Sequence, residues 1–391
     1  MKKIILLLSI LFVFSSYCQA QFPKPPKPGS SKNAKQKNET KTPVKKGTSD
    51  DFLAVAREAK DWGYIDKTGV AVIGFQFSAA KSFSEGYARV ESMNSWGYID
   101  PKGKYVINPQ FERAEDFCEG LARVEKFKKW GYIEKSGTFS INPQFDDAED
   151  FEGGLARVRK GTFWGLIDIK GSYVVNPQFA ALGPFRDGLA RARIGKDWGY
   201  VNKEGKWEIN PQFNDAEDFN GDLARVRKGT EWGFIDRTGS FAINPQFEAV
   251  GDFYEGLARA KKMRQWGYID KAGIWTVNPQ FDDAGDFVEG FAKVRKGKEW
   301  GYIEAAGTYS INPQFADAED FSNGMARVKL GTQWGFINKK GTYVINPQFS
   351  EAKNFINGFS LVRKGPKWGF INENGDIVID FLFIDAEVFS K

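Results

Sequence analysis

The sequence predicts an all-β protein of tandem 34-residue repeats, each a β-hairpin extended by a third strand, stacked into an open, solenoid-like array. The first observation is a Trp-Gly pair that recurs at constant spacing and is followed by a large apolar residue, a β-branched residue and an acid or amide. Repetition without insertion or deletion is typical of units that bury apolar surface against their neighbours. The tryptophans are Trp62, Trp96, Trp130, Trp164, Trp198, Trp232, Trp266, Trp300, Trp334 and Trp368.

Turn glycines and β-branched rows are the second and third observations. A glycine stands seven residues after each tryptophan in all ten copies, from Gly69 to Gly375, as expected where φ must be positive. The residues three and eleven after each tryptophan are β-branched, which favours strands. Tetratricopeptide helix pairs share the 34-residue period, but these glycines, the β-branched rows and eight Asn-Pro pairs argue against helices.

One module shows the expected order of elements. Residues 223–227 suit a first strand and residues 232–236 a second, with a Lys-Gly-Thr turn between them. Residues 241–247 suit a third strand, which must end or run along an edge because Pro245 lacks a backbone donor. Residues 248–255 form a polar connector with room for one helical turn at most.

Aromatic rows predict the core and a candidate binding surface. Phenylalanine occupies the positions fifteen and twenty-one after every tryptophan, so we expect both rows, with tryptophan, to pack between repeats. The position nine after tryptophan varies among aromatic residues and is the better candidate for exposure and for sugar stacking. The possible ligand-contact aromatics are Tyr105, Tyr173, Trp207, Trp275, Tyr309 and Tyr343.

The ends of the array leave one alternative open. The repeats begin with a copy of the first strand at residues 53–57 and stop at Phe389, just before that strand would recur. A closed, propeller-like ring could result. Propellers typically have about 4 to 8 four-stranded blades, and a unit of this length leaves room for about three short strands, so the open array is favoured.

The N-terminal segments are expected to be separate from the array. Residues 1–20 have the form of a secretory signal peptide, with Lys2 and Lys3 before an apolar run and Ala20 at the cleavage position. Residues 21–50, rich in proline and lysine, predict a disordered linker. Residues 51–391 then hold ten repeats in one array. These features predict export to the periplasm, the cell surface or the medium, with no transmembrane segment after cleavage.

Charge argues against nucleic acid as a partner. Residues 21–49 carry eight lysines and one acid. When these and Lys2 and Lys3 are removed from the 55 basic and 50 acidic residues of the chain, 45 basic and 49 acidic residues remain. The array is therefore slightly acidic and lacks the clustered cations that phosphates require.

The chemistry of the side chains predicts no enzyme and no cofactor. The chain has no histidine, which excludes Ser-His, Cys-His and His-metal arrangements. Acidic clusters at residues 146–150, 282–283 and 317–320 could serve a carbohydrate-active enzyme or bind calcium, but their recurrence in polar connectors is typical of solvated turns. The basic row seven residues before tryptophan and the acidic row four residues after it, exemplified by Arg225 and Asp236, predict a charge ladder within each hairpin.

Departures from the repeat mark the places where a unique site could lie. They gather at residues 182–186 and 263–265, in the middle of the array.

These residues resemble the WG-repeat, or KWG-repeat, family of bacterial exported proteins, which has arrays of Trp-Gly-(Tyr/Phe)-Ile-Asp with a following glycine and a later Pro-x-Phe. The resemblance covers residues 53–389 and implies a β-rich, exported protein without an agreed activity. We therefore expect a monomeric, non-enzymatic scaffold whose extended surface binds a protein or a polysaccharide. A carbohydrate-active or calcium-dependent surface protein and a structural envelope spacer are the alternatives.

Overall fold

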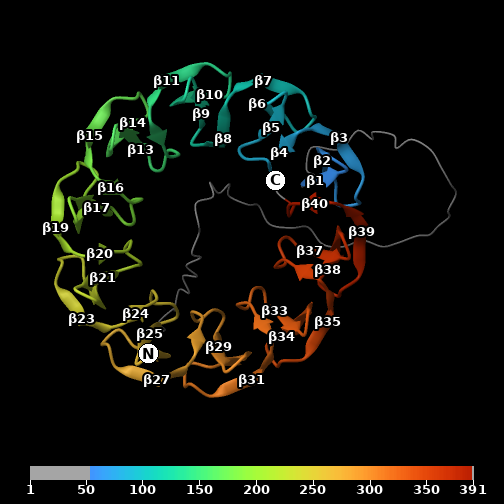
Figure 1. Cartoon of the computed structure of the whole chain (residues 1–391). Coiled ribbons are helices and arrows are strands. Elements are labelled where there is room, and N and C mark those ends of the chain that lie inside the picture. Colours follow the sequence, from blue (N-terminus) through green and yellow to red (C-terminus); the bar gives the residue numbers. More distant parts are fainter. Residues whose placement is uncertain (1–52, 390–391) are drawn as a thin grey trace, which may run out of the picture. The chain divides into compact units, whose positions relative to one another are not determined.

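Residues 53–389, described by a computed structural model, form a closed ring of ten four-stranded antiparallel sheets, a ten-bladed β-propeller (Figure 1). The expected open, solenoid-like array is therefore wrong, and the alternative of a propeller-like ring is confirmed. Closure is direct, because the last strand, β40, pairs antiparallel with the first strand, β1. The expected signal peptide and linker, residues 1–20 and 21–50, lie outside the described residues.

The blades follow the chain in order, and the first blade is completed by the end of the chain. Blade 1 contains β40, β1, β2 and β3. Blades 2 to 10 are β4–β7, β8–β11, β12–β15, β16–β19, β20–β23, β24–β27, β28–β31, β32–β35 and β36–β39.

The innermost strand of each blade is short, two residues long in every blade but blade 3. This answers the objection that a 34-residue unit has room for only three strands, because the fourth strand occupies so little chain. The innermost strands are β4 (Ala79–Ala80), β8 (Arg113–Cys118), β12 (Asp147–Ala148), β16 (Ala181–Leu182), β20 (Asp215–Ala216), β24 (Ala249–Val250), β28 (Asp283–Ala284), β32 (Asp317–Ala318), β36 (Glu351–Ala352) and β40 (Asp385–Ala386).

The second and third strands form the hairpin that the sequence predicts. The second strands are β1 (Ala54–Glu58), β5 (Ala88–Ser92), β9 (Leu121–Lys126), β13 (Leu155–Lys160), β17 (Ala190–Ile194), β21 (Ala224–Lys228), β25 (Ala258–Lys262), β29 (Ala292–Lys296), β33 (Met325–Leu330) and β37 (Phe359–Lys364). The third strands are β2 (Asp61–Ile65), β6 (Ser95–Ile99), β10 (Lys129–Glu134), β14 (Phe163–Asp168), β18 (Asp197–Val201), β22 (Glu231–Ile235), β26 (Gln265–Ile269), β30 (Glu299–Ile303), β34 (Gln333–Asn338) and β38 (Lys367–Asn372).

The outer strands lie on the circumference of the ring, and eight of them contain an Asn-Pro-Gln-Phe segment; β3 and β39 have Gly-Phe-Gln-Phe and Asp-Phe-Leu-Phe instead (Figure 1). Each outer strand is an edge of its blade, which confirms the edge position expected from proline. They are β3 (Ala71–Phe77), β7 (Tyr105–Phe111), β11 (Phe139–Phe145), β15 (Tyr173–Phe179), β19 (Trp207–Phe213), β23 (Phe241–Phe247), β27 (Trp275–Phe281), β31 (Tyr309–Phe315), β35 (Tyr343–Phe349) and β39 (Ile377–Phe383).

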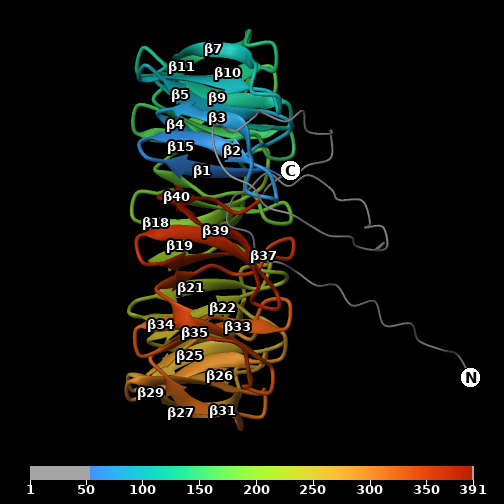
Figure 2. The ribbon, with the colours of Figure 1, turned by 90° about the vertical axis from the view of Figure 1, so that its right-hand side faces the viewer.

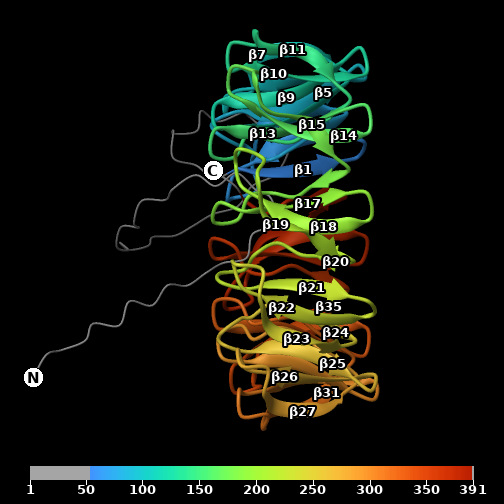
Figure 3. The same ribbon diagram turned by 90° about the vertical axis from the view of Figure 1, so that its left-hand side faces the viewer.

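The two faces of the ring carry different loops, since strands alternate in direction across each blade (Figures 2 and 3). One face, here called the hairpin face, carries the turns between second and third strands. The opposite connector face carries the loops from innermost to second strands and the turns that contain the glycines of the Gly69 row. Within residues 53–389 the connectors contain no helical turn; in blade 2, for example, Ser84 and Tyr87 pair across a tight turn.

The core lies between blades, as the aromatic rows predict. The row of Phe77 and Phe111 is buried throughout, and the row of Phe83 and Phe117 is buried or half-buried. In the cluster between blades 2 and 3, the Tyr98 ring lies 4.9 Å from the Phe117 ring, between centroids. The tryptophans are mostly half-buried, because arginine and lysine side chains cover their rings; the Arg57 guanidinium carbon, for example, lies 5.4 Å from the Trp62 ring centroid.

The glycine of each Trp-Gly pair has a steric cause that blade 6 illustrates. Strand β23 bulges over β22, so that Trp232 pairs with Phe247 and Phe234 pairs with Ile243. A Cβ on Gly233 would lie 2.5 Å from the Ile243 carbonyl oxygen, closer than real contacts allow. The Asn-Pro-Gln segment can therefore cross this point only over a glycine.

We predict that Gly233→Ala lowers the free energy of unfolding by about 1–3 kcal/mol, because β23 must move away from the new methyl group. Urea unfolding measures this. Gly74→Ala is the matched control, since a Cβ at Gly74 in the outer strand β3 meets no atom within 4 Å. Equal losses for the two variants would contradict the steric explanation.

Candidate binding surfaces

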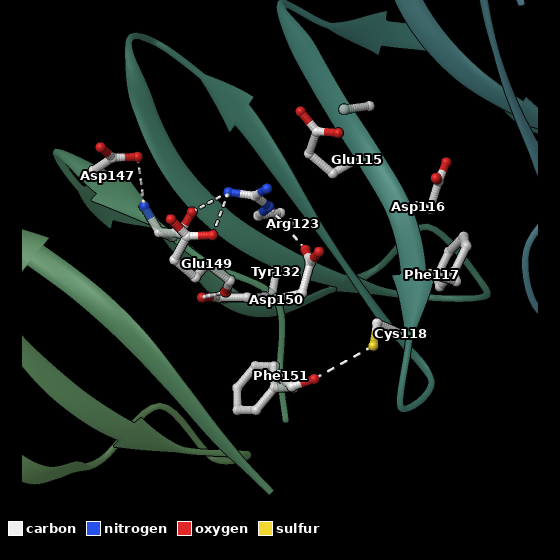
Figure 4. A network of polar contacts seen from close by, with 12 residues as sticks. Glu115, Asp116, Phe117, Cys118, Arg123, Tyr132, Asp147, Glu149, Asp150 and Phe151 are labelled. Carbon is white, nitrogen blue, oxygen red and sulfur yellow. Dashed lines mark hydrogen bonds and ion pairs between the residues drawn. The ribbon is translucent and has the colours of Figure 1, made fainter. Parts of the chain in front are cut away.

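Arginines of the second strands join neighbouring blades by ion pairs near the axis. In Figure 4, Arg123 of blade 3 reaches Asp150 of blade 4, with its Nε 2.8 Å from the aspartate Oδ1. Its Nη1 donates a hydrogen bond to the Ala148 carbonyl oxygen and lies 3.7 Å from a Glu149 oxygen. The carboxylates of the connectors thus hold adjacent blades together.

The same contact recurs around the ring. The basic residue seven before tryptophan pairs with the aspartate twenty-seven residues after that basic residue, in the next blade. Six such pairs are Arg89–Asp116, Arg123–Asp150, Arg191–Asp218, Arg225–Asp252, Arg259–Asp286 and Lys293–Asp320. In a seventh case Arg327 donates to the amide oxygen of Asn354.

The expected charge ladder within each hairpin is therefore wrong. Arg225 pairs with Asp252 of the next blade at 2.6 Å, whereas Asp236 accepts hydrogen bonds from the backbone N–H groups of Thr238 and Ser240 in its own turn. The register explains the difference, since Arg225 lies opposite Phe234 rather than Asp236. The acidic row caps turns, and the basic row joins blades.

Burial makes these aspartates dependent on their partners. Burial raises the pKa of Asp150 above its usual value, and Arg123 opposes this shift. For Arg123, burial acts to lower the pKa, but Asp150 and Glu149 outweigh it and the pKa is raised. Asp150 and Arg123 therefore each stabilise the charged form of the other, as in a structural ion pair.

The acidic clusters predicted from the sequence lie in these contacts and in turns. Asp146 accepts a hydrogen bond from the Gly161 backbone N–H at 2.6 Å, and Asp147 pairs with Arg159 at 3.3 Å. Asp282 and Asp283 do the same with Gly297 and Arg295. Within residues 53–389, no three carboxylate or thiol groups are placed so that they could hold a metal ion.

The six candidate aromatics are distributed around the circumference rather than gathered in one site. Each opens an outer strand and leans on the buried phenylalanine of the preceding blade; the Phe247 and Trp275 rings, for example, lie 5.6 Å apart at 89°. Tyr173 and Tyr309 are exposed, and the other four are half-buried. Their role in sugar binding stays a prediction.

One of these aromatics does line a groove. Trp275 and Pro279 of the outer strand β27 face Lys262, Met263 and Gln265 of the hairpin in the same blade, around a groove of about 300 Å³. Two of the groove residues belong to the segment 263–265 that departs from the repeat.

The second departing segment, residues 182–186, alters the ion pair between blades 4 and 5. Pro184 occupies the place of the aspartate that would pair with Arg157, and Gly183 occupies the place of the preceding residue, which is glutamate in several blades. Among the described residues, the side chain of Arg157 keeps only its hydrogen bond to the Leu182 carbonyl oxygen, at 2.8 Å. Burial lowers the pKa of Arg157, and here the surrounding carboxylates do not outweigh it. A pocket between blades 4 and 5 is lined by Arg157, Leu155, Leu166, Pro184, Phe185, Asp150 and Glu152.

The hairpin face holds a feature that sequence reasoning missed. Met93 and Phe127, in the turns of the adjacent blades 2 and 3, have φ of 51° and 56° and side chains that are 96% and 79% exposed. Met263 of blade 7 is similar, with φ of 53° and 82% exposure. The sequence signal is the loss of the turn glycine, which is present at the equivalent position in six blades: Gly161, Gly195, Gly229, Gly297, Gly331 and Gly365.

Matches among solved structures have low sequence identity and TM-scores below 0.5. A eukaryotic initiation factor matches with a TM-score of 0.49 and 8% identity over 86% of this chain and 98% of that one. PorZ, a surface component of the type-IX secretion system of Porphyromonas gingivalis, matches with a TM-score of 0.29 and 10% identity over 84% of this chain and 52% of PorZ. The dihydro-heme d1 dehydrogenase NirN matches with a TM-score of 0.37 and 10% identity over 86% of this chain and 74% of that one.

No curated protein matches the sequence. Among the described residues, no helix is long and apolar enough to cross a membrane. The model of the WG containing repeat matches ten consecutive segments: 62–94, 96–130, 130–161, 164–196, 198–229, 232–262, 266–300, 300–331, 334–368 and 368–391. These segments cover most of the chain, so the protein belongs to the family of WG containing repeats.

Proposed function

We propose that the chain is an exported, non-enzymatic scaffold that binds a protein partner through the hairpin face of blades 2 and 3. The observation that carries the proposal is the pair of exposed, left-handed residues Met93 and Phe127. A left-handed conformation costs a residue with a side chain about 1–2 kcal/mol. Six blades avoid this cost with glycine, whereas blades 1, 2, 3 and 7 accept it at Ala59, Met93, Phe127 and Met263. Met93 and Phe127 are the two in adjacent blades that place a large apolar side chain in water.

Strain that serves no packing contact is best explained by a contact with another molecule. Met93 and Phe127 lie in adjacent blades on the same face, so one partner surface can cover both. Exposed methionine and phenylalanine are typical anchors that fill apolar pockets in protein interfaces.

Charge next to Phe127 indicates the chemistry of the partner. Lys126 and Lys128 flank Phe127, and the Lys126 ammonium lies 5.9 Å from the centre of its ring. We therefore propose a partner with an apolar pocket and an acidic rim, because such a rim would complement the lysines.

The acidic residues support a scaffold rather than an enzyme. The connector carboxylates are taken up by ion pairs between blades and by turn hydrogen bonds, as with Asp150 and Asp146. A glycosidase would need a pair of carboxylates facing a substrate cleft.

Export is proposed from the N-terminal sequence, in which Lys2 and Lys3 precede an apolar run that ends before Ala20. Mass spectrometry of the protein from the source cells tests this, with the mature chain expected to begin at Gln21.

We predict that Met93→Gly together with Phe127→Gly abolishes partner capture while raising stability by about 1 kcal/mol per site, because glycine relieves the left-handed strain. The immobilised full chain would be offered envelope extract, and saturable capture would be compared between variants. Urea unfolding would measure the gain in stability.

Ala59→Gly is the matched control, since Ala59 has the equivalent left-handed turn position in blade 1, with φ of 51°, but carries no large apolar side chain. It should raise stability equally and leave capture unchanged. Undiminished capture by the double glycine variant would contradict the proposed surface.

Polysaccharide binding is the second candidate, and the groove beside Trp275 favours it. A volume of about 300 Å³ is at the lower end of the range for ligand pockets, and the half-buried Trp275 indole that lines it offers an aromatic surface to a sugar ring.

We predict that Trp275→Ala lowers the affinity of the full chain for a retained polysaccharide at least tenfold, measured against a panel by affinity electrophoresis. Tyr309→Ala is the control, because Tyr309 has the same position in the next blade without lining the groove. Equal effects of both changes, or of neither, would argue against the groove as the sugar site.

A further inference from the structure

Arg157 differs from the other arginines that join blades, because within residues 53–389 no carboxylate lies at ion-pair distance from it; Glu149, Asp218 and Glu152 act on it electrostatically from farther away. Arg157 belongs to β13 of blade 4, and the next blade presents Pro184 at the position where six other blades present aspartate and one presents asparagine. The cation is half-buried, and its one hydrogen bond goes to the Leu182 carbonyl oxygen.

The missing carboxylate leaves a space beside the guanidinium. The pocket has about 20 Å³ of room, where one water-sized atom needs about 10–15 Å³. One or two oxygen atoms can therefore enter, which suits the end of a single carboxylate. The walls of this space are apolar and are formed by Leu155, Leu166, Pro184 and Phe185. Apolar walls strengthen a charge-assisted hydrogen bond, because the local dielectric constant is low.

The other charges at the pocket are already paired. Asp150 is bound by Arg123 at 2.8 Å, and Glu152 is bound by Arg186 at 2.7 Å. At the other arginine sites, the aspartate of a neighbouring site does not prevent a second aspartate from pairing with its own arginine. Asp116 and Asp150 influence each other electrostatically, yet both of these sites are filled by their own aspartates.

We propose that Arg157 is a receptor site for an aspartate side chain of a separate acidic protein segment, which enters from the connector face between blades 4 and 5. The chain itself shows what fits beside the arginine, since six equivalent sites hold an aspartate; the phenylalanine that follows this aspartate in those blades is already present here as Phe185. The site lies on the opposite face from Met93 and Phe127 and does not depend on the proposal for the hairpin face.

The six filled sites also indicate which kind of carboxylate fits the Arg157 site. In each of them the carboxylate is on a short, unbranched aspartate side chain next to an apolar residue, which a peptide can copy and a sugar ring cannot. A uronate polysaccharide and a simple anion are therefore the alternatives that an experiment must separate from a peptide.

The test measures binding of the capped dipeptide Ac-Asp-Phe-NH2 to the full chain by NMR, through the arginine side-chain Nε–H signals. The Arg157 signal is assigned as the one that disappears in Arg157→Gln. We expect a saturable shift of this signal with Ac-Asp-Phe-NH2 and a shift at least tenfold weaker in affinity with Ac-Asn-Phe-NH2.

Pro184→Asp is the decisive variant, because it supplies the carboxylate from within the chain as the other blades do. We expect this variant to fold, which its circular dichroism spectrum checks. It should unfold at a higher urea concentration than the natural chain, and its affinity for the dipeptide should be at least tenfold lower. Thr332→Asp is the control, because it adds one carboxylate at an exposed position in the hairpin turn of blade 9, away from the pocket.

Four results would overturn the proposal: equal binding of the asparagine dipeptide, undiminished binding by Pro184→Asp, a shift with oligogalacturonate or phosphate but not with the dipeptide, or no shift with any probe. The capture experiment on Met93 and Phe127 has a separate readout, so the failure of one proposal is distinguishable from the failure of the other.

Discussion

The pairing of β40 with β1 is the constraint on which the rest of the structure depends. Ala386 and Asp385 lie opposite Ala56 and Arg57, so the end of the chain supplies the innermost strand of blade 1. Around this pairing, Lys81 and Glu387 form an ion pair at 3.0 Å. Apolar residues of blades 10 and 1 share one core cluster. The ring therefore needs no capping repeat, and every blade packs between two neighbours.

Much of the fold could be predicted from the sequence because the repeat displays each local rule ten times. The period, the hairpin, the edge position of proline and the buried phenylalanine rows follow from propensity and spacing. Closure could not be predicted with the same means. It depends on a pairing between the two ends of the chain and on innermost strands such as β12, whose two residues are too few to show a strand pattern.

The charged rows show where pattern alone is insufficient. Arg225 and Asp236 occur in adjacent strands, and their spacing suggests a pair, but the register sets them two positions apart. The partner of Arg225 is Asp252 in the next blade, which sequence spacing within one repeat does not reveal. An interaction between blades becomes predictable only when the ring and the order of its strands are known.

Binding sites in a repeat ring arise where one blade differs from the others. The sequence indicated residues 182–186 and 263–265, and the structure places the Arg157 pocket and the Trp275 groove there. It did not indicate Met93 and Phe127, because replacement of a turn glycine is recognisable as strain only when φ is known. The regular blades supply a rigid frame, and the irregular ones supply the surfaces on which we place function.

The most direct test of this account is a disulfide across the closing strands. Arg57→Cys with Asp385→Cys places two cysteines at paired positions, where antiparallel Cα atoms lie about 4.5–5.5 Å apart and a disulfide fits. Mass spectrometry after oxidation in dilute solution would detect the linked peptide. A closed ring predicts that residues 57 and 385 become linked within one molecule in most of the protein. An open array predicts no such link, or links between separate molecules only, and either finding would contradict the ring.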